Sequence, residues 1–344
     1  MSVVTRCAVI LVLLAALTTH QLHPEDVPSP EEPPVPPLGL RFGFGAGLQN
    51  IRFPLDSGAS PADTGTLGSD ELVLSPNTPL YMVLGVSWRS LGVGLRLNLP
   101  DTVPLQESRG ETQFTNLQLQ LYGQRYAADL LYQNHRGMYI ENAGAFAVPI
   151  PEIRVPDMEL ETVGVTFLWS RNPRVNLATA YKLDSVPTRS RAGILWLASL
   201  NRITLDAATG PGGTVPALDG SVWGSSMNLE TYSAVAGVGA TTMLTYASVF
   251  FSPLVALGLG AQRTDYSVLG DSNREWAVVP QLSVRASAGY NAPGWYLALL
   301  FSADLRNVQT PFLQAVQGST RIDLVFGRRY TMKRWQGTRG LSLR

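Results

Sequence analysis

Histidine is the side chain best suited to act as a base near neutral pH, and the chain has three. His20 and His23 lie near the N-terminus, so His135 is the candidate base in the rest of the chain. Hydrolysis of a lipid, or acyl transfer to one, would need a nucleophile held beside that base, but no serine lies in a Gly-x-Ser-x-Gly motif. We therefore expect no catalytic residue and no enzyme; a lipid-modifying enzyme built on His135 is the alternative.

Cysteine and histidine are too few to suggest a metal site or a cofactor. The single cysteine, Cys7, lies in the N-terminal segment, and the Asp219-Gly220 pair lacks the ligand spacing of a calcium loop. The 26 basic and 26 acidic residues give a formal net charge of zero, whereas binding of nucleic acid requires a basic face. We expect no metal, no cofactor and no nucleic-acid partner.

Eight charged residues stand out because their neighbours along the sequence are apolar. They are Arg96, Asp129, Lys182, Arg285, Asp304, Arg306, Arg321 and Asp323. In an extended chain successive side chains point to opposite faces, and an arginine or lysine facing the middle of a bilayer would cost about 2–4 kcal/mol. We therefore interpret these residues as lining the interior of a barrel, where they either pair and close it or line a water-filled pore.

The surrounding stretches alternate between polar and apolar residues, as in strands with one face in lipid. From Leu91 to Leu99 every odd position is apolar. Because an open sheet would leave unpaired amides in lipid, we predict an all-β fold: a single antiparallel transmembrane β-barrel of the outer-membrane type, with about 14 strands and 12 as the alternative. The strands are expected at 39–51, 79–90, 91–100, 112–124, 125–136, 159–171, 174–185, 190–199, 201–207, 229–240, 245–263, 276–290, 294–307 and 317–330.

The connections predict the topology, because outer-membrane barrels have short periplasmic turns and long outer loops. Tight turns are expected at 89–90, 123–124, 171–173, 241–242 and 291–293, and long loops at 52–78, 101–111, 137–158, 208–228 and 264–275. This alternation requires a hairpin within 190–207 that turns at Ser199-Leu200-Asn201. Aromatic residues near strand ends are expected to form interface girdles: Trp88, Tyr126, Trp169, Tyr181, Trp276, Tyr290 and Trp295.

The N-terminal residues have the pattern of a secretory signal peptide, with Arg6 before an apolar run from Ala8 to Leu17. We assign residues 1–20 to this signal and 21–38, which are rich in proline, to an extended periplasmic leader. The barrel is expected at 39–330 and a basic tail at 331–344. This organisation predicts export by the secretory pathway to the bacterial outer membrane, with outer-membrane lipid, lipopolysaccharide and the barrel-assembly machinery as partners.

Several motifs together resemble domain-of-unknown-function family 4421. They are Ser75-Pro76-Asn77, the hairpin from Leu80 to Leu97, the stretch from Asp129 to Tyr139, Pro156-Asp157 and Ala192-Gly193. The resemblance covers roughly residues 39 to 330 and implies an exported outer-membrane barrel without known catalytic residues. The chain departs from the family at Arg191 and Ile194, where members have serines.

The polar interior therefore carries the functional prediction. Barrels much wider than this one are those with a free aqueous channel, so we predict a narrow or plugged pore or an envelope-structural component. A surface-assembly partner without pore activity is a further alternative beside the lipid-modifying enzyme.

Overall fold

The computed structural model of the protein describes residues 38–54, 71–78, 80–88, 90–99, 102, 109–140, 153–172, 174–183, 189–207, 227–268, 271–309 and 314–330. The strands are β1 (Leu38–Pro54), β2 (Glu71–Ser75), β3 (Tyr81–Trp88), β4 (Leu91–Asn98), β5 (Gln113–Tyr122), β6 (Tyr126–Ile140), β7 (Ile153–Ser170), β8 (Arg191–Ala207), β9 (Met227–Tyr246), β10 (Val249–Val268), β11 (Asp271–Asn291), β12 (Trp295–Gln309) and β13 (Gln314–Tyr330). A short π-helix, η2 (Ala178–Lys182), lies between β7 and β8.

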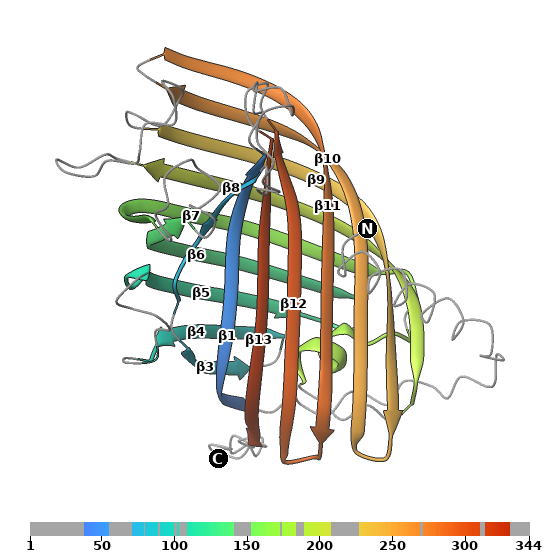
Figure 1. Ribbon diagram of the computed structural model, residues 1–344. Helices are drawn as coiled ribbons and strands as arrows, with labels where there is room; N and C mark the ends of the chain where they lie inside the picture. Colours follow the sequence, from blue (N-terminus) through green and yellow to red (C-terminus); the bar gives the residue numbers. More distant parts are fainter. Residues whose placement is uncertain are drawn as a thin grey trace, which may run out of the picture.

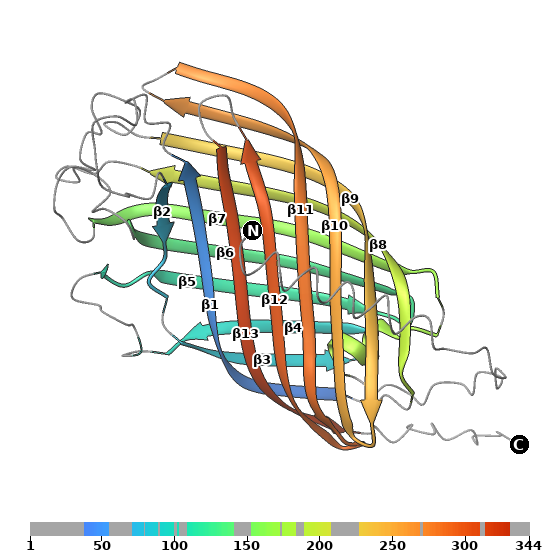
Figure 2. The same cartoon turned by 45° about the vertical axis from the view of Figure 1, so that its right-hand side comes forward.

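The strands close into an antiparallel barrel (Figure 1 and Figure 2). Each strand from β3 to β13 pairs with the next along the chain, and β1 completes a ring of twelve strands by pairing with β3 and β13. The remaining strand, β2, lies outside this ring and pairs with both β1 and β6. The predicted all-β barrel is confirmed, and the ring has the lower of the two predicted numbers of strands.

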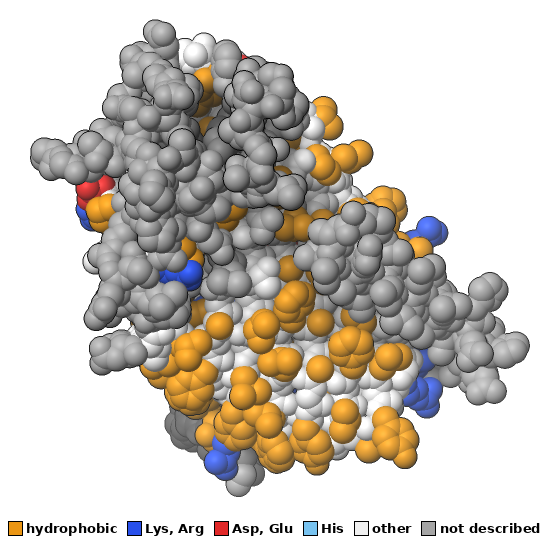
Figure 3. All heavy atoms as spheres, viewed as in Figure 1, with side chains coloured by type: hydrophobic (Ala, Val, Ile, Leu, Met, Phe, Trp, Pro, Cys, Tyr) orange, Lys and Arg blue, Asp and Glu red, His pale blue; other side chains and the backbone are white. Residues whose placement is uncertain are grey.

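The outer surface of the ring is apolar and its interior is polar. In β4, Leu91, Val93, Leu95 and Leu97 are exposed, whereas Arg96 is buried. Exposed leucine, valine and phenylalanine side chains also follow β1, β5, β12 and β13, and Figure 3 shows apolar side chains spread over the outside of the barrel. This is the inverse of a water-soluble protein and suits a barrel that is surrounded by lipid.

The two ends of the barrel differ. Short turns join β3 to β4, β5 to β6, β9 to β10 and β11 to β12 at one end, which we call the short-turn end, and there Leu38 also pairs with Tyr330. Exposed aromatic side chains gather at this end as in an interface girdle: Trp88, Tyr126, Tyr246, Tyr290, Trp295 and Tyr330. The rings of Tyr290 and Trp295 stack with centroids 5.0 Å apart.

Two segment predictions are wrong. Residues 190–207 form no hairpin, because β8 runs without a break from Arg191 to Ala207. Ser199 and Asn201 suggest a turn in the sequence, but both are buried side chains that face the polar interior. Of the strand predicted at 174–185, the structure describes residues 174–183, and these form no strand. They contain η2, in which Tyr181 is buried and so belongs to no girdle.

The strands β9, β10 and β11 are longer than predicted. The turn expected at 241–242 lies at Ala247-Ser248, and the long loop expected at 264–275 consists largely of β10 and β11, which end and begin at Val268 and Asp271. The polar residues there pair between strands: Asp265 Oδ1 accepts a hydrogen bond of 2.7 Å from Arg274 Nε. Cross-strand pairs of this kind satisfy charged side chains in a sheet that extends into water.

The predicted signal peptide, the leader up to residue 37 and the tail at 331–344 lie outside the described residues. In the part of the chain that the structure describes, no helix is long and apolar enough to cross a membrane.

Candidate functional site in the barrel interior

Asp323 of β13 is the centre of one charged cluster in the interior. Its Oδ2 lies 2.8 Å from Nη2 of Arg96 and 3.5 Å from Nε of Arg321, and the Tyr81 hydroxyl donates a 2.7 Å hydrogen bond to its Oδ1. Arg96 also donates to Asn116 Oδ1 at 3.1 Å. The side chains of Arg96 and Asp323 are 6% and 2% exposed, so water screens this ion pair very little.

Asp129 of β6 is the centre of a second cluster. The Tyr122 hydroxyl lies 3.1 and 2.9 Å from its two carboxylate oxygens and donates to them. Arg285 of β11 forms an ion pair with the same carboxylate. Because β6 and β11 lie on opposite sides of the ring, this pair spans the interior.

One cavity lies between these clusters. Seven of the eight charged residues singled out from the sequence line it: Arg96, Asp129, Arg285, Asp304, Arg306, Arg321 and Asp323. Its volume is about 90 Å³, enough for a few water molecules at roughly 10–15 Å³ each. The charged side chains of the interior therefore surround a small cavity.

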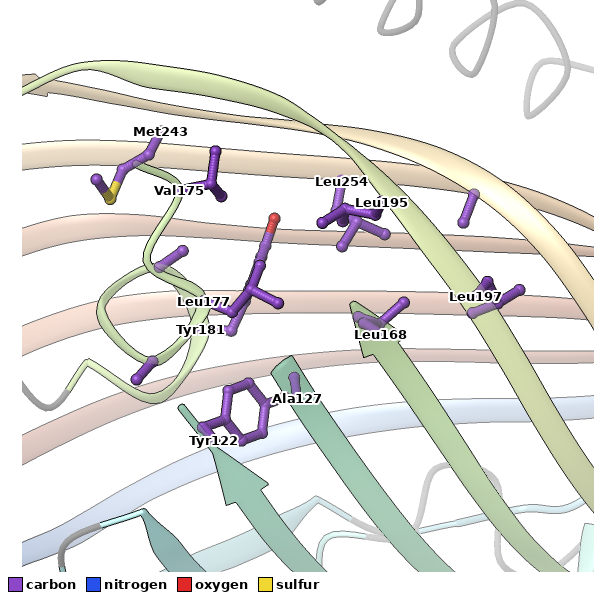
Figure 4. Packing of buried hydrophobic residues seen from close by; sticks show 13 residues of the cluster. Tyr122, Ala127, Leu168, Val175, Leu177, Tyr181, Leu195, Leu197, Met243 and Leu254 are labelled. Carbon is purple, nitrogen blue, oxygen red and sulfur yellow. The ribbon is translucent and has the colours of Figure 1, made fainter. Parts of the chain in front are cut away.

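The eighth residue, Lys182, is buried at the end of η2. Residues 174–183, which we call the plug, follow β7 into the short-turn end of the barrel. The plug places Val175, Leu177 and Tyr181 among the strands (Figure 4). Leu177 is fully buried, in a cluster that also contains Leu168, Leu195, Met243 and Leu254. The backbone N–H of Leu177 donates to Gln124 O at 3.0 Å, which ties the plug to the turn between β5 and β6.

Side chains of the barrel wall hold the plug by its carbonyl oxygens. Arg41 of β1 donates to Lys182 O at 3.1 Å, Arg329 of β13 donates to Leu183 O at 3.1 Å, and Ser287 of β11 donates to Ala180 O at 2.5 Å. These donors satisfy carbonyl groups that a short helix leaves without partners at its end. The contacts come from three separate strands, so the plug is held within the short-turn end of the interior.

His135 of β6 points inward and is 2% exposed. The centroid of its ring lies 4.8 Å from that of Phe114, and its Nδ1 is buried without a hydrogen-bond partner. A second small cavity lies at this position, and its wall includes Tyr81 and Arg321. His135 is therefore a core residue of the interior.

Sequence reasoning missed the two arginines that hold the plug. Arg41 lies between Leu40 and Phe42, so the rule that selected Arg96 would also have selected it. Arg329 gives a weaker signal because it follows Arg328, and two adjacent arginines do not reveal which one points inward. The structure shows that Arg328 is exposed and Arg329 is buried.

Acidic and histidine side chains do not gather into a metal site in the described ranges. Among those residues, no group of three or more His, Cys, Asp and Glu side chains is placed to hold a metal ion.

The family model described as "Domain of unknown function (DUF4421)" matches residues 68–330. This match confirms the resemblance seen in the sequence motifs. No curated protein matches the chain.

Solved structures of outer-membrane proteins are similar to the chain at low identity. The outer membrane protease OmpT from Escherichia coli gives a TM-score of 0.41 at 10% identity, covering 86% of this chain and 97% of that chain. The toluene transporter TodX from P. putida gives 0.26 at 10% identity, covering 89% and 92%. The attachment invasion locus protein Ail of Yersinia pestis gives 0.24 at 11% identity, covering 62% and 97%. Likenesses of this strength concern the fold alone.

One prediction is corrected by these comparisons. We expected no enzyme, yet OmpT is an outer-membrane protease. The expectation that the chain is not an enzyme is therefore withdrawn.

Proposed function

This chain belongs to the family described as "Domain of unknown function (DUF4421)", and for this member we propose the function of a plugged pore in the outer membrane. In this proposal the polar interior is the passage, and the plug closes it at the periplasmic end, where outer-membrane barrels have their short turns. The closed form is the resting form.

The attachment of the plug carries the proposal. The ring of paired strands is complete without residues 174–183, so the plug can move without breaking a strand pair. Two kinds of contact hold the plug in place. Leu177 and Tyr181 pack in an apolar cluster, and burial of a side chain such as leucine stabilises the folded state by about 1.5–3 kcal/mol. Arg41, Arg329 and Ser287 donate hydrogen bonds to carbonyl groups of the plug.

Conductance across a planar bilayer tests this proposal. We expect the wild-type protein to be silent and the Arg41→Ala/Arg329→Ala variant to conduct steadily, because two of the donors to the plug are gone. Arg328→Ala is the matched control, since this arginine lies next to Arg329 but points outward. Folding is checked by the migration of unheated and heated protein in a gel. A folded double variant that stays silent would contradict a pore and favour an envelope-structural role.

A further inference from the structure

The cavity in the interior has more guanidinium groups than carboxylates in its wall. The positive side chains are Arg41, Arg96, Arg285, Arg306 and Arg321, and the negative ones are Asp129, Asp304 and Asp323. Five positive against three negative charges leave an excess of two. An excess of positive charge that is partly shielded from water is unfavourable unless a counter-charge balances it.

Two of the three carboxylates are already fully engaged. Asp323 accepts hydrogen bonds from Arg96 and Tyr81, and Asp129 accepts them from Tyr122 and Arg285. Arg321 reaches Asp323 only at 3.5 Å. Asp304 is therefore the one carboxylate in this wall that is not paired with another arginine and could pair with Arg306.

Arg306 does not use that carboxylate. Among the described residues it forms no ion pair, and its buried Nε has no hydrogen-bond partner. Directly opposite Arg306 in the strand register is Gln281 of β11, whose amide Nε2 is also buried without a partner, while its Oε1 accepts from Ser199. Facing side chains on neighbouring strands are about 5 Å apart at Cβ, so the two side chains with unused donors start from adjacent positions on the inner face.

We propose that one small oxyanion, of the carboxylate or phosphate class, binds at the cavity wall beside Arg306, with Arg306 and its strand neighbour Gln281 as donors. A guanidinium group offers parallel N–H donors that match two oxygens of such an anion. The cavity of about 90 Å³ accepts an ion of a few heavy atoms and excludes a sugar or a lipid chain. The site does not depend on movement of the plug.

Calorimetric titration of the purified full-length protein in detergent micelles tests the site. Inorganic phosphate and acetate are the two probes, in a buffer that contains neither. We expect saturable binding of at least one probe with one site per chain, weakened about tenfold or more in Arg306→Gln, because a charge-assisted hydrogen bond is lost. Arg306→Lys is expected to retain part of the affinity, and Arg328→Gln, on the outer face, to bind as the wild type does.

The inference is overturned if the folded wild type binds neither probe, or if Arg306→Gln binds as tightly as Arg328→Gln. Should Arg306→Gln fail to fold, Gln281→Leu takes its place, since it removes an unused donor without removing a charge. Binding measured in this way is independent of conductance, so failure of the plugged-pore proposal and failure of the oxyanion site are distinguished.

Discussion

Arg96 and Asp323 connect two strands that are not neighbours in the barrel. Nη2 of Arg96 on β4 lies 2.8 Å from Oδ2 of Asp323 on β13, and both β3 and β1 lie between these strands in the ring. The pair therefore joins parts of the wall that no backbone hydrogen bond connects. It is also almost completely buried, so its effect on stability depends on whether both partners are present.

Replacement of Asp323 by leucine is expected to destabilise the barrel by about 3–5 kcal/mol, because Arg96 would be left buried without a counter-charge. The Arg96→Met/Asp323→Leu variant should recover part of this loss, since Arg96 is then no longer left buried without its counter-charge, although Arg321 still lacks Asp323. The midpoint of urea unfolding, followed by gel migration, measures both. Asp206→Leu, at an exposed position on β8, is the control; if Asp323→Leu unfolds at the same urea concentration as this control, the ion pair contributes nothing.

The Asp129 and Arg285 pair predicts a charge-swap effect. Arg285→Glu places two carboxylates together in a site where their side chains are 5% and 16% exposed in the wild type. We expect a loss of about 3 kcal/mol or more, as for a broken buried pair. Adding Asp129→Arg restores opposite charges and should recover part of the loss in the same urea titration. A double variant less stable than Arg285→Glu would mean that the two residues do not interact.

Shortening a buried side chain of the plug is expected to loosen the plug without unfolding the barrel. Leu177→Ala removes a fully buried side chain, a change that costs about 2–5 kcal/mol where the site cannot collapse. Because the ring is complete without the plug, we expect the urea midpoint to change little. Thr179→Cys, buried in the wild type, should react with a maleimide much faster in the Leu177→Ala background; equal labelling rates would show that the plug stays seated.

The sequence pattern predicts strands well where the two faces differ most. From Leu91 to Leu99 the alternation leaves one choice of outward face, and the structure has that face. It fails at Ser199 and Asn201, because polar residues that face a polar interior look like those of a turn. It fails again at 174–183, where almost every side chain is buried and no face alternates.

The interior residues could be identified from the sequence, but not their partners. The alternation selects Arg96 and Asp323 one by one, since each is flanked by apolar residues. Which arginine meets which carboxylate depends on how the ring closes, and the separation of 227 positions in sequence from Arg96 to Asp323 leaves that undetermined. For the same reason the excess of positive charge around Arg306 becomes visible only when the pairs have been assigned.

The apolar belt predicts the effect of a charge on the outer face. Leu117, near the middle of β5, is 44% exposed on the outside of the barrel. Leu117→Arg should lower the stability in lipid vesicles by about 2–4 kcal/mol, the cost of an arginine at the bilayer midplane. Ser272→Arg, exposed at the opposite end of the barrel from the short turns, should change the stability little. Equal effects of the two substitutions would contradict the position of the belt.

The turn between β9 and β10 gives a prediction in which two similar substitutions have opposite signs. Ala247 has a φ angle of 53°, in the left-handed region that costs a residue with a Cβ about 1–2 kcal/mol. Ala247→Gly should therefore raise the stability by about 0.5–1 kcal/mol, after allowance for the greater freedom of glycine in the unfolded chain.

Ala261 lies exposed within β10, where glycine relieves no strain. There Ala261→Gly should lower the stability by about 0.5–1 kcal/mol. Urea titrations of both variants decide between the turn at 247–248 and the turn that the sequence predicted at 241–242. If Ala247 instead lay within a strand, both substitutions would destabilise the protein to a similar extent, because neither alanine would have a left-handed conformation for glycine to relieve.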